Sequence, residues 1–531
     1  MRTKRWSRWA RVALAAAMMA GAVGTGCRVS ENDVHRWEST EHGPEKLVAV
    51  VTHDKYEPSL RIQSALALVR MKPRGGRRVG ITKMVDALAQ LSPEARRMLV
   101  AGMVPTLVEE MGKPPPVAQG GGQIPPDLSI PYKDAAFALL SYDKTVLVGD
   151  EEPKQKLTAA LIGWIVADFE HRYDNASQMF GVEQVVRFLG AVCTKPLPKL
   201  IATDSRKISD IAKLVSENGD QPTKEEASGK LVEVAKATVD QSWLDKMKPI
   251  LEEANRAQKL APTPDQFKMQ LEKAQDEQLE RVFGAMRKVG GRAVVEYCLE
   301  FAGNTKHSED RRVRALAAIE GNFDTKNPND VQRILALAGG EETPDKIRDL
   351  AFLRVGEVPR DKVINKLYEI FTHNKKWQVR WVAAQVAIKM STTDQIPEII
   401  SKLPGGKSEN FAMTEALTYG DWMGNTKTMA EKDGKTARAQ LSPFLKEGAT
   451  AARFTAFGFF YSHGAKTDLE MLSSYEGDKL PAPKCDDKQK DCEWKCYIPK
   501  EGKPDEKEPK DVGTLGDFVK YCIEPTIKAQ K

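Results

Sequence analysis

The stretch Trp377–Met390, WQVRWVAAQVAIKM, decides the fold of this chain of 531 residues. It contains an apolar residue and an arginine, Val379 and Arg380, followed by two small residues, Ala383 and Ala384. At helical spacing these positions share one face. Small side chains on that face let a second helix approach closely, and the aliphatic residues beside them fill the seam. The stretch therefore predicts the second helix of a tightly packed helical pair.

The same pattern recurs along the chain, with a looser copy around Arg453. The arginines of three successive copies, Arg314, Arg348 and Arg380, are 34 and 32 residues apart, a spacing typical of a structural repeat. Each copy follows another amphipathic segment, so each repeat is predicted to be two helices joined by a polar turn. One such pair cannot bury its apolar face alone, which favours stacking of pairs. The copies begin at Leu60-Arg61, Val313-Arg314, Ile347-Arg348 and Val379-Arg380, and the segments before them include GPEKLVAVV (43–51), GGRAVVEYCLEFAG (290–303), NDVQRILALAGG (329–340) and RDKVINKLYEIF (360–371).

These residues resemble HEAT repeats, whose second helix opens with Val-Arg and a small-residue pair; RRVRALAAIEG (311–321) and residues 377–390 match best. The resemblance implies an α-solenoid with a ladder of ion pairs, in which each repeat arginine meets an aspartate of an adjacent turn. The turn before Arg380 carries Asn374 and two lysines, so we expect an interruption there. The expected ladder arginines are Arg61, Arg314, Arg348 and Arg380, and the candidate aspartates are Asp54, Asp310 and Asp345.

The predicted fold class is therefore all-α: an α-solenoid of HEAT-like helical hairpins with a small disulfide-rich C-terminal tail. A generic helical bundle with chance periodicity is the alternative. The predicted organisation is a lipoprotein signal peptide (1–26), a tether (27–43), HEAT-like repeats (44–111), a Pro/Gly-rich loop (112–131), a helical segment (132–202), a charged helical segment (203–290), further HEAT-like repeats (291–480) and a Cys-rich tail (481–531).

The first residues have the pattern of an export signal. Residues 1–11 contain five basic and no acidic side chains, and the apolar run 12–23 precedes Gly24-Thr25-Gly26-Cys27. That run is too short to cross a bilayer as a helix. The small residues before Cys27 resemble a bacterial lipobox, although Gly24 stands where leucine is usual. The resemblance implies lipidation of Cys27 and, because Arg28 follows, sorting to the outer membrane on its periplasmic face. An ordinary signal peptide and an uncut anchor remain the alternatives.

Charge and hydropathy exclude several classes of protein. The 80 Lys and Arg against 74 Asp and Glu give a net charge of +6, but removing residues 1–26 takes away five positive charges. The remaining chain is nearly neutral and has no basic cluster interleaved with aromatic residues, so we expect no nucleic-acid partner. A mean hydropathy of −0.45 argues against a multi-span membrane protein.

The seven cysteines fall into three groups. Cys27 is the lipidation candidate, while Cys193 and Cys298 stand singly in apolar helical patterns and are interpreted as buried hydrophobic residues. Four cysteines near the C-terminus of an exported chain predict two disulfides, with three possible connectivities. Zinc is the alternative, although only one pair has a zinc-like spacing. The disulfide candidates are Cys485, Cys492, Cys496 and Cys522.

The sequence contains no nucleophile elbow and no zinc-protease motif, and its seven histidines are scattered. We therefore expect no catalytic residues, no bound metal and no cofactor. The leading hypothesis is a membrane-anchored periplasmic scaffold or assembly factor in the cell envelope that binds another protein. The alternative is an envelope enzyme, or a subunit of one, with its site in residues 203–290 or in the Cys-rich tail.

Overall fold

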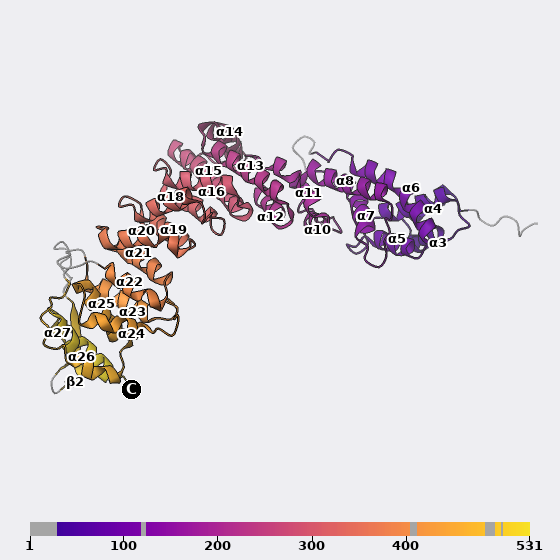
Figure 1. Ribbon diagram of the computed structural model, residues 1–531. Coiled ribbons are helices and arrows are strands. Elements are labelled where there is room, and N and C mark those ends of the chain that lie inside the picture. The colour runs from indigo at the N-terminus through magenta and orange to yellow at the C-terminus, as the bar shows by residue number, and fades with distance from the viewer. Residues whose placement is uncertain (1–28, 118–123, 404–410, 484–493, 501–502, 531) are drawn as a thin grey trace, which may run out of the picture. The chain divides into compact units, whose positions relative to one another are not determined.

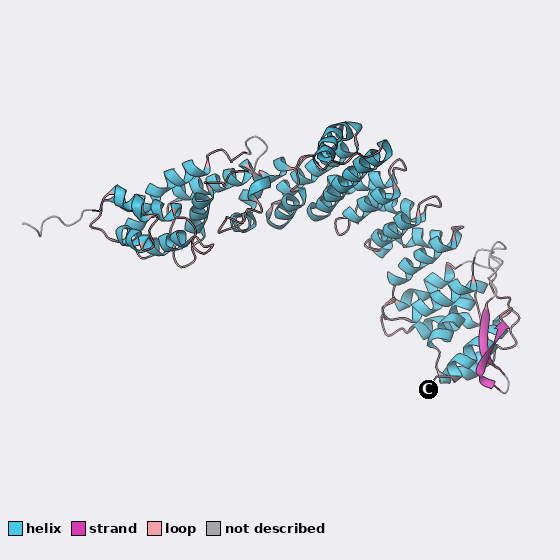
Figure 2. Ribbon diagram, turned by 180° about the vertical axis from the view of Figure 1, so that it is seen from behind, coloured by secondary structure: helices cyan, strands magenta, loops and turns pink. Residues whose placement is uncertain are grey.

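The computed structural model describes residues 29–117, 124–403, 411–483, 494–500 and 503–530. Most of them are helical, which confirms the all-α prediction, and the strands in this part of the chain form one short hairpin (Figure 2). The chain divides into two compact units, residues 1–227 and 228–531, called here the N-terminal and C-terminal units. The boundary between them falls within α13 (Gln221–Val239).

In the N-terminal unit, α2, α3, α4 and α6 each contact both the next helix and the next but one. The predicted pair is seen as α3 with α4, and α4 also contacts α5, α6 and α7 (Figure 1). The helices are α2 (Glu31–Trp37), α3 (Gly43–Thr52), α4 (Pro58–Arg70), α5 (Val79–Ala89), α6 (Pro93–Met111), α7 (Ile130–Ser141), α8 (Glu151–Ala167), α9 (Phe169–Arg172), α10 (Val182–Leu189), α11 (Ala191–Thr194), the 3₁₀ turn η1 (Leu197–Leu200) and α12 (Ile208–Asn218).

In the C-terminal unit the helices form two rows. Odd-numbered helices from α15 to α25 each contact the next odd-numbered helix, and α16, α18 and α20 form the neighbouring row. The helices are α14 (Gln241–Ala257), α15 (Pro264–Val289), α16 (Arg292–Gly303), α17 (Glu309–Ala318), α18 (Pro328–Gly339), α19 (Asp345–Val355), α20 (Arg360–His373), α21 (Trp377–Lys389), η2 (Thr393–Gln395), α22 (Ile396–Ser401), α23 (Met413–Gly424), α24 (Ala437–Leu441), η3 (Ser442–Leu445), α25 (Thr450–His463), η4 (Lys466–Asp468) and α26 (Leu469–Ser473).

The closest packing in the C-terminal unit is between α23 and α25, where two glycines meet. A Cβ atom on Gly420 would lie 2.4 Å from the Phe459 nitrogen and the Thr455 oxygen, and one on Gly458 would lie 2.8 Å from the Leu417 Cα. Only glycine allows two backbones this close. The small-residue face predicted for the repeats therefore takes its most extreme form in this pair.

The prediction of a tether is wrong for residues 30–43, which belong to the folded N-terminal unit. Ser30 and Asp33 form a reciprocal capping box that starts α2, and Val34 on that helix is 1% exposed. The Arg70 guanidinium donates to the Glu38 carboxylate at 2.5 Å and so joins the segment to α4. A capped helix with a buried side chain belongs to the folded unit, because its ends are satisfied and its apolar face is covered.

The C-terminal tail has more of a core than its composition suggested. Strands β1 (Lys495–Lys500) and β2 (Lys503–Asp511) pair antiparallel, followed by α27 (Leu515–Phe518), the π-helical turn η5 (Val519–Ile523) and α28 (Glu524–Lys528). The Phe518 ring lies 6.4 Å from that of Phe454 on α25. We expected crosslinks to replace a missing core, but here apolar packing contributes as well; the buried residues are Val512, Leu515, Phe518, Val519, Ile523 and Ile527.

Candidate functional site

The repeat arginines cap the helix that precedes them. The Arg61 Nε donates to the Val51 oxygen at 2.9 Å, in the last turn of α3, and the Arg380 guanidinium donates to the Asn374 oxygen at 3.0 Å, just after α20. Arg348 reaches the Gly340 and Thr343 oxygens just after α18. The last carbonyls of a helix lack intrahelical partners, so a buried guanidinium there satisfies groups that would otherwise be stranded. These arginines hold each helical pair together.

In α17 the prediction of Arg314 as the repeat arginine is wrong by two positions. Arg312 is the buried one, 6% exposed, and its Nε donates to the Ala302 oxygen at 2.7 Å. Arg314 lies half-buried on another face, 3.6 Å from the Glu280 carboxylate. The segment RRVR offers several arginines, and only the face that meets α16 selects among them: Ala315, Leu316 and Ile319 are buried on the same side as Arg312.

The predicted arginine–aspartate ladder is mostly absent from the described residues. The Asp54 side chain is 98% exposed beside His53, and Asp310 lies 3.5 Å from the Lys346 ammonium. Only Asp345 meets a repeat arginine, Arg348, at 2.5 Å and within one helix. At the expected interruption, Arg380 is paired with Glu415 at 2.8 Å, and both side chains are buried.

A different ladder joins the helices of the other row. Arg292 at the start of α16 donates to Asp330 on α18 at 3.0 Å, and Arg360 at the start of α20 lies 2.8 Å from Glu398 on α22. These two pairs are each 38 residues apart, whereas Arg438 and Asp468, which also form an ion pair, are 30 residues apart. Sequence reasoning missed this ladder, although an arginine and an acidic residue recurring at one spacing was an available signal.

An aromatic surface, called here the tryptophan patch, lies on α21 and α23. It consists of Trp377, Trp381 and Trp422, with ring centroids 6.1 Å apart for the first two and 5.2 Å for the last two. Trp377 is 41% exposed, and on the neighbouring α19 Leu353 is 58% exposed. Trp381 and Trp422 are half-buried, so the patch is an aromatic surface that is exposed mainly at Trp377.

A groove of about 830 Å³ lies between α18 and α20. Val331, Leu335 and Ile370 line it, and Lys362 and Lys366 stand at its rim. The Lys366 ammonium is already paired with Glu369 at 2.7 Å, and Lys362 lies 3.4 Å from the Asp361 carboxylate.

A larger groove, of about 1460 Å³, lies in the N-terminal unit. Three segments supply most of its lining, residues 70–82 between α4 and α5, residues 124–132 leading into α7 and residues 168–179 after α8, and Glu110 and Pro116 complete it. We call it the proline groove, because five prolines are among its lining residues: Pro73, Pro116, Pro125, Pro126 and Pro131.

Buried charges lie behind the wall of the proline groove. Lys133 and Asp134 on α7 are both fully buried and lie 2.7 Å apart, and the Arg78 guanidinium is 3.3 Å from Asp134. Burial lowers the pKa of Lys133, and the Asp134 charge opposes that shift. Arg172, 1% exposed, donates to Asp127 at 2.9 Å and stacks 4.2 Å from the Trp164 ring. Sequence reasoning missed this cluster, because its members are far apart in the chain.

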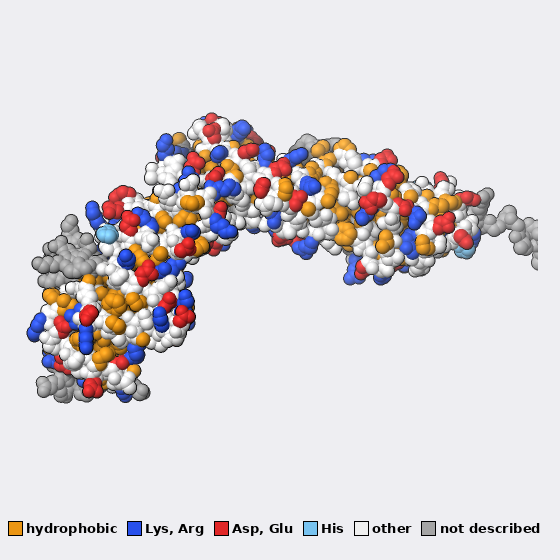
Figure 3. All heavy atoms as spheres, in the orientation of Figure 1, with side chains coloured by type: hydrophobic (Ala, Val, Ile, Leu, Met, Phe, Trp, Pro, Cys, Tyr) orange, Lys and Arg blue, Asp and Glu red, His pale blue; other side chains and the backbone are white. Residues whose placement is uncertain are grey.

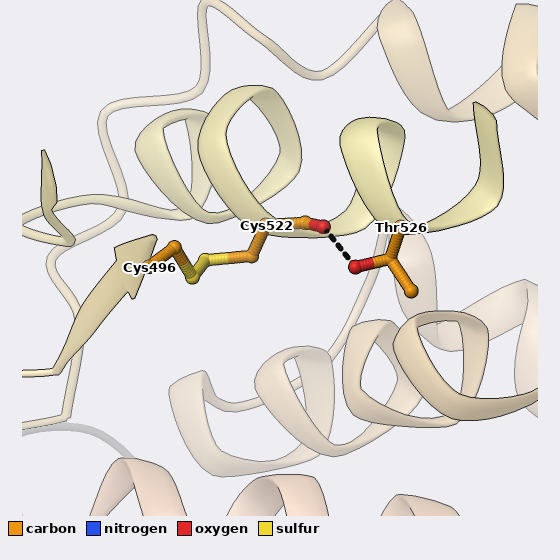
Figure 4. The surroundings of a disulfide bond; sticks show 3 residues. All are labelled: Cys496, Cys522 and Thr526. Carbon is orange, nitrogen blue, oxygen red and sulfur yellow. Dashed lines mark hydrogen bonds between the residues drawn. A yellow bond between two sulfur atoms is a disulfide. The ribbon is translucent and has the colours of Figure 1, made fainter. Parts of the chain in front are cut away.

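The cysteines are placed as follows. Cys496 in β1 is bonded to Cys522 in η5, which selects one of the candidate pairs, and the Thr526 hydroxyl donates to the Cys522 oxygen at 2.7 Å (Figure 4). Cys485, Cys492 and Cys27 lie outside the described residues. Cys193 and Cys298 are 1% and 0% exposed, which confirms their interpretation, and burial raises the pKa of Cys193 to about 12.

Residues 203–290, the alternative location for an enzymatic site, form α12 to α15. In the described part of the chain, no three His, Cys, Asp or Glu side chains are grouped as a metal site, and no helix is long and apolar enough to span a membrane. Acidic and basic side chains are interspersed on the visible face (Figure 3). No family model matches the chain, and no curated protein is significantly similar to it.

Proposed function

We propose that the chain is a HEAT-like α-solenoid lipoprotein that binds another protein at the bacterial cell envelope, as a non-catalytic scaffold or assembly factor. Two rows of helices with paired charges between neighbours support the solenoid interpretation. A solenoid exposes a long surface formed by the second helices of its repeats. Such a surface binds partner proteins without catalysing a reaction.

The tryptophan patch is the observation that carries this proposal. Tryptophan is enriched at the energetic centres of protein interfaces, because one residue buries a large rigid area and offers an N–H. Trp377, Trp381 and Trp422 lie on consecutive second helices, α21 and α23, where a partner could contact all three. They are a candidate interface centre.

Affinity purification of the full chain from solubilised membranes tests the proposal. We expect a partner protein in stoichiometric amount, lost when Trp377 and Trp422 are both changed to alanine. Tyr497→Ala is the matched control, because Tyr497 is also aromatic and 65% exposed but lies in the tail hairpin. A monomer carrying a small molecule or metal, with no protein partner, would contradict the scaffold function.

The anchor has its own test. Cys27→Ser is expected to release the chain from the membrane fraction, because the acyl chains are lost and each buried CH₂ contributes about 0.8 kcal/mol. Unchanged retention in the membrane fraction would refute lipidation at Cys27.

A further inference from the structure

The wall of the proline groove is held in place before any ligand binds. The Asp134 carboxylate accepts hydrogen bonds from the backbone nitrogens of Met179 and Phe180 at 2.9 and 3.2 Å. The Arg78 guanidinium donates to the Ser177 oxygen at 3.1 Å. Residues 177–180 are thus fixed to α7 by buried charge, and a fixed wall saves the entropy that binding would otherwise cost.

The charges of the proline groove do not balance. Its three carboxylates are each paired within the unit: Glu110 with Lys113 at 2.6 Å, Asp127 with Arg172 at 2.9 Å and Asp168 with His171 at 2.7 Å. Lys72 and Arg77 also line the groove and are exposed, and no described carboxylate lies within ion-pair distance of either. Lys72 and Arg77 are therefore exposed cations of the groove without a described ion-pair partner, whereas the Asp168 charge is neutralised only when His171 is protonated.

The groove also presents apolar side chains to solvent. Leu128 is 80% exposed, and Ile124 and Met179 are 40% and 41% exposed. A complementary occupant would cover this apolar surface and gain roughly 25 cal/mol for each Å² buried.

We propose that the proline groove binds an extended segment of a partner protein that carries acidic and apolar side chains. Lys72 and Arg77 face its carboxylates, and Ile124, Leu128 and Met179 contact its apolar side chains. This site rests on the proposed scaffold function and adds to it a second contact with a stated chemistry.

Selection of random twelve-residue peptides displayed on phage, against the full chain in detergent, tests this site. We expect the selected peptides to be enriched in Asp, Glu and apolar residues. For one such peptide, measured by fluorescence anisotropy, the double variant Lys72→Glu and Arg77→Glu should weaken binding about tenfold and remove its salt dependence, because rim charges act through long-range attraction. Leu128→Asp should weaken binding as well.

The matched control is Lys268→Glu with Lys273→Glu, which reverses two exposed lysines on α15 and should leave the affinity unchanged. Three results would each overturn the site: no selected peptide, peptides without acidic enrichment, or affinity unaffected by the Lys72 and Arg77 changes. Binding of phosphatidylglycerol vesicles that depends on Lys72 and Arg77, without peptide binding, would also overturn it in favour of a lipid.

The partner purification separates failure of this site from failure of the scaffold function. A partner retained by the Lys72 and Arg77 variant but lost from the tryptophan variant would leave the scaffold function standing and refute the groove as its contact. Absence of any partner from the unmodified chain would refute the scaffold function itself.

Discussion

The two units are built from the same helical pairs but are held together differently. In the C-terminal unit, ion pairs recur between neighbouring repeats, as in Arg292–Asp330 and Arg360–Glu398. The N-terminal unit also contains such a pair, Glu45–Lys83, but in addition a buried cluster around Lys133 and Asp134 ties α7 to residues 177–180. This cluster supports loops that surround the proline groove.

The difference also separates two kinds of binding surface. The tryptophan patch is a face of consecutive helices, so it follows from the repeat itself. The proline groove depends on loops, which are more tolerant of change than helices but need support to hold one shape. Here the buried charges behind its wall supply that support.

The largest expected effect tests the buried cluster around Lys133 and Asp134. Asp134→Ala removes the charge that faces Lys133 and Arg78 and also two hydrogen-bond acceptors for backbone nitrogens. Breaking a buried pair on one side costs about 3–5 kcal/mol, because the remaining charge is left uncompensated. Hydrogen exchange measured by mass spectrometry should show that residues 130–180 lose protection. Protection in the C-terminal unit should stay unchanged.

The control for this change is Asp54→Ala, since the Asp54 side chain is 98% exposed. It should leave both the unfolding temperature and the exchange pattern unchanged. Equal protection in the Asp134 variant and the unmodified chain would show that the cluster does not hold the groove.

A smaller effect is expected at the closest helix contact of the C-terminal unit. Gly420→Ala places a methyl group against the backbone of α25 and should cost about 3 kcal/mol through overpacking. Gly284→Ala, on α15 with no atom near its Cβ position, should instead raise stability by about 0.5–1 kcal/mol because alanine favours the helix. Thermal unfolding of the two variants should give shifts of opposite sign, and shifts of the same sign would contradict the close packing of α23 and α25.

The smallest effect concerns one step of the ladder. Arg292→Ala leaves the buried Asp330 without its guanidinium partner, but the Arg292 side chain is 41% exposed and solvent weakens the pair, so we expect a loss of about 1 kcal/mol. Lys268→Ala, whose pair with Glu272 is exposed on both sides, should cost nothing measurable by urea unfolding. If both variants unfold at the same urea concentration, the ladder contributes nothing to the stacking.

Much of the fold could be predicted because its signals are local. Helix class, the pairing of helices within a repeat and the burial of Cys193 and Cys298 all follow from the spacing of apolar and small residues. The misplaced repeat arginine has one cause. For Arg312 against Arg314, two positions carry the same side chain, and only the orientation of the paired helix decides which is buried.

The candidate sites were harder to predict, because their residues meet only after folding. Trp381 and Trp422 are 5.2 Å apart but belong to different helices, and Asp134 binds nitrogens 45 residues away. The four C-terminal cysteines allow three connectivities, and the sequence does not show that Cys496 pairs with Cys522.

The sequence by itself determined that this protein is helical, that several of its helices come in pairs joined by polar turns, and that its net positive charge comes mostly from its first residues. Only the tertiary structure decided which arginine is buried in each pair, which carboxylate it meets, and where a groove or an aromatic face is exposed. The physical reason is that the spacing of apolar residues over a short stretch determines which face of a helix is buried. The segment that covers this face depends on how helices distant in sequence stack against it.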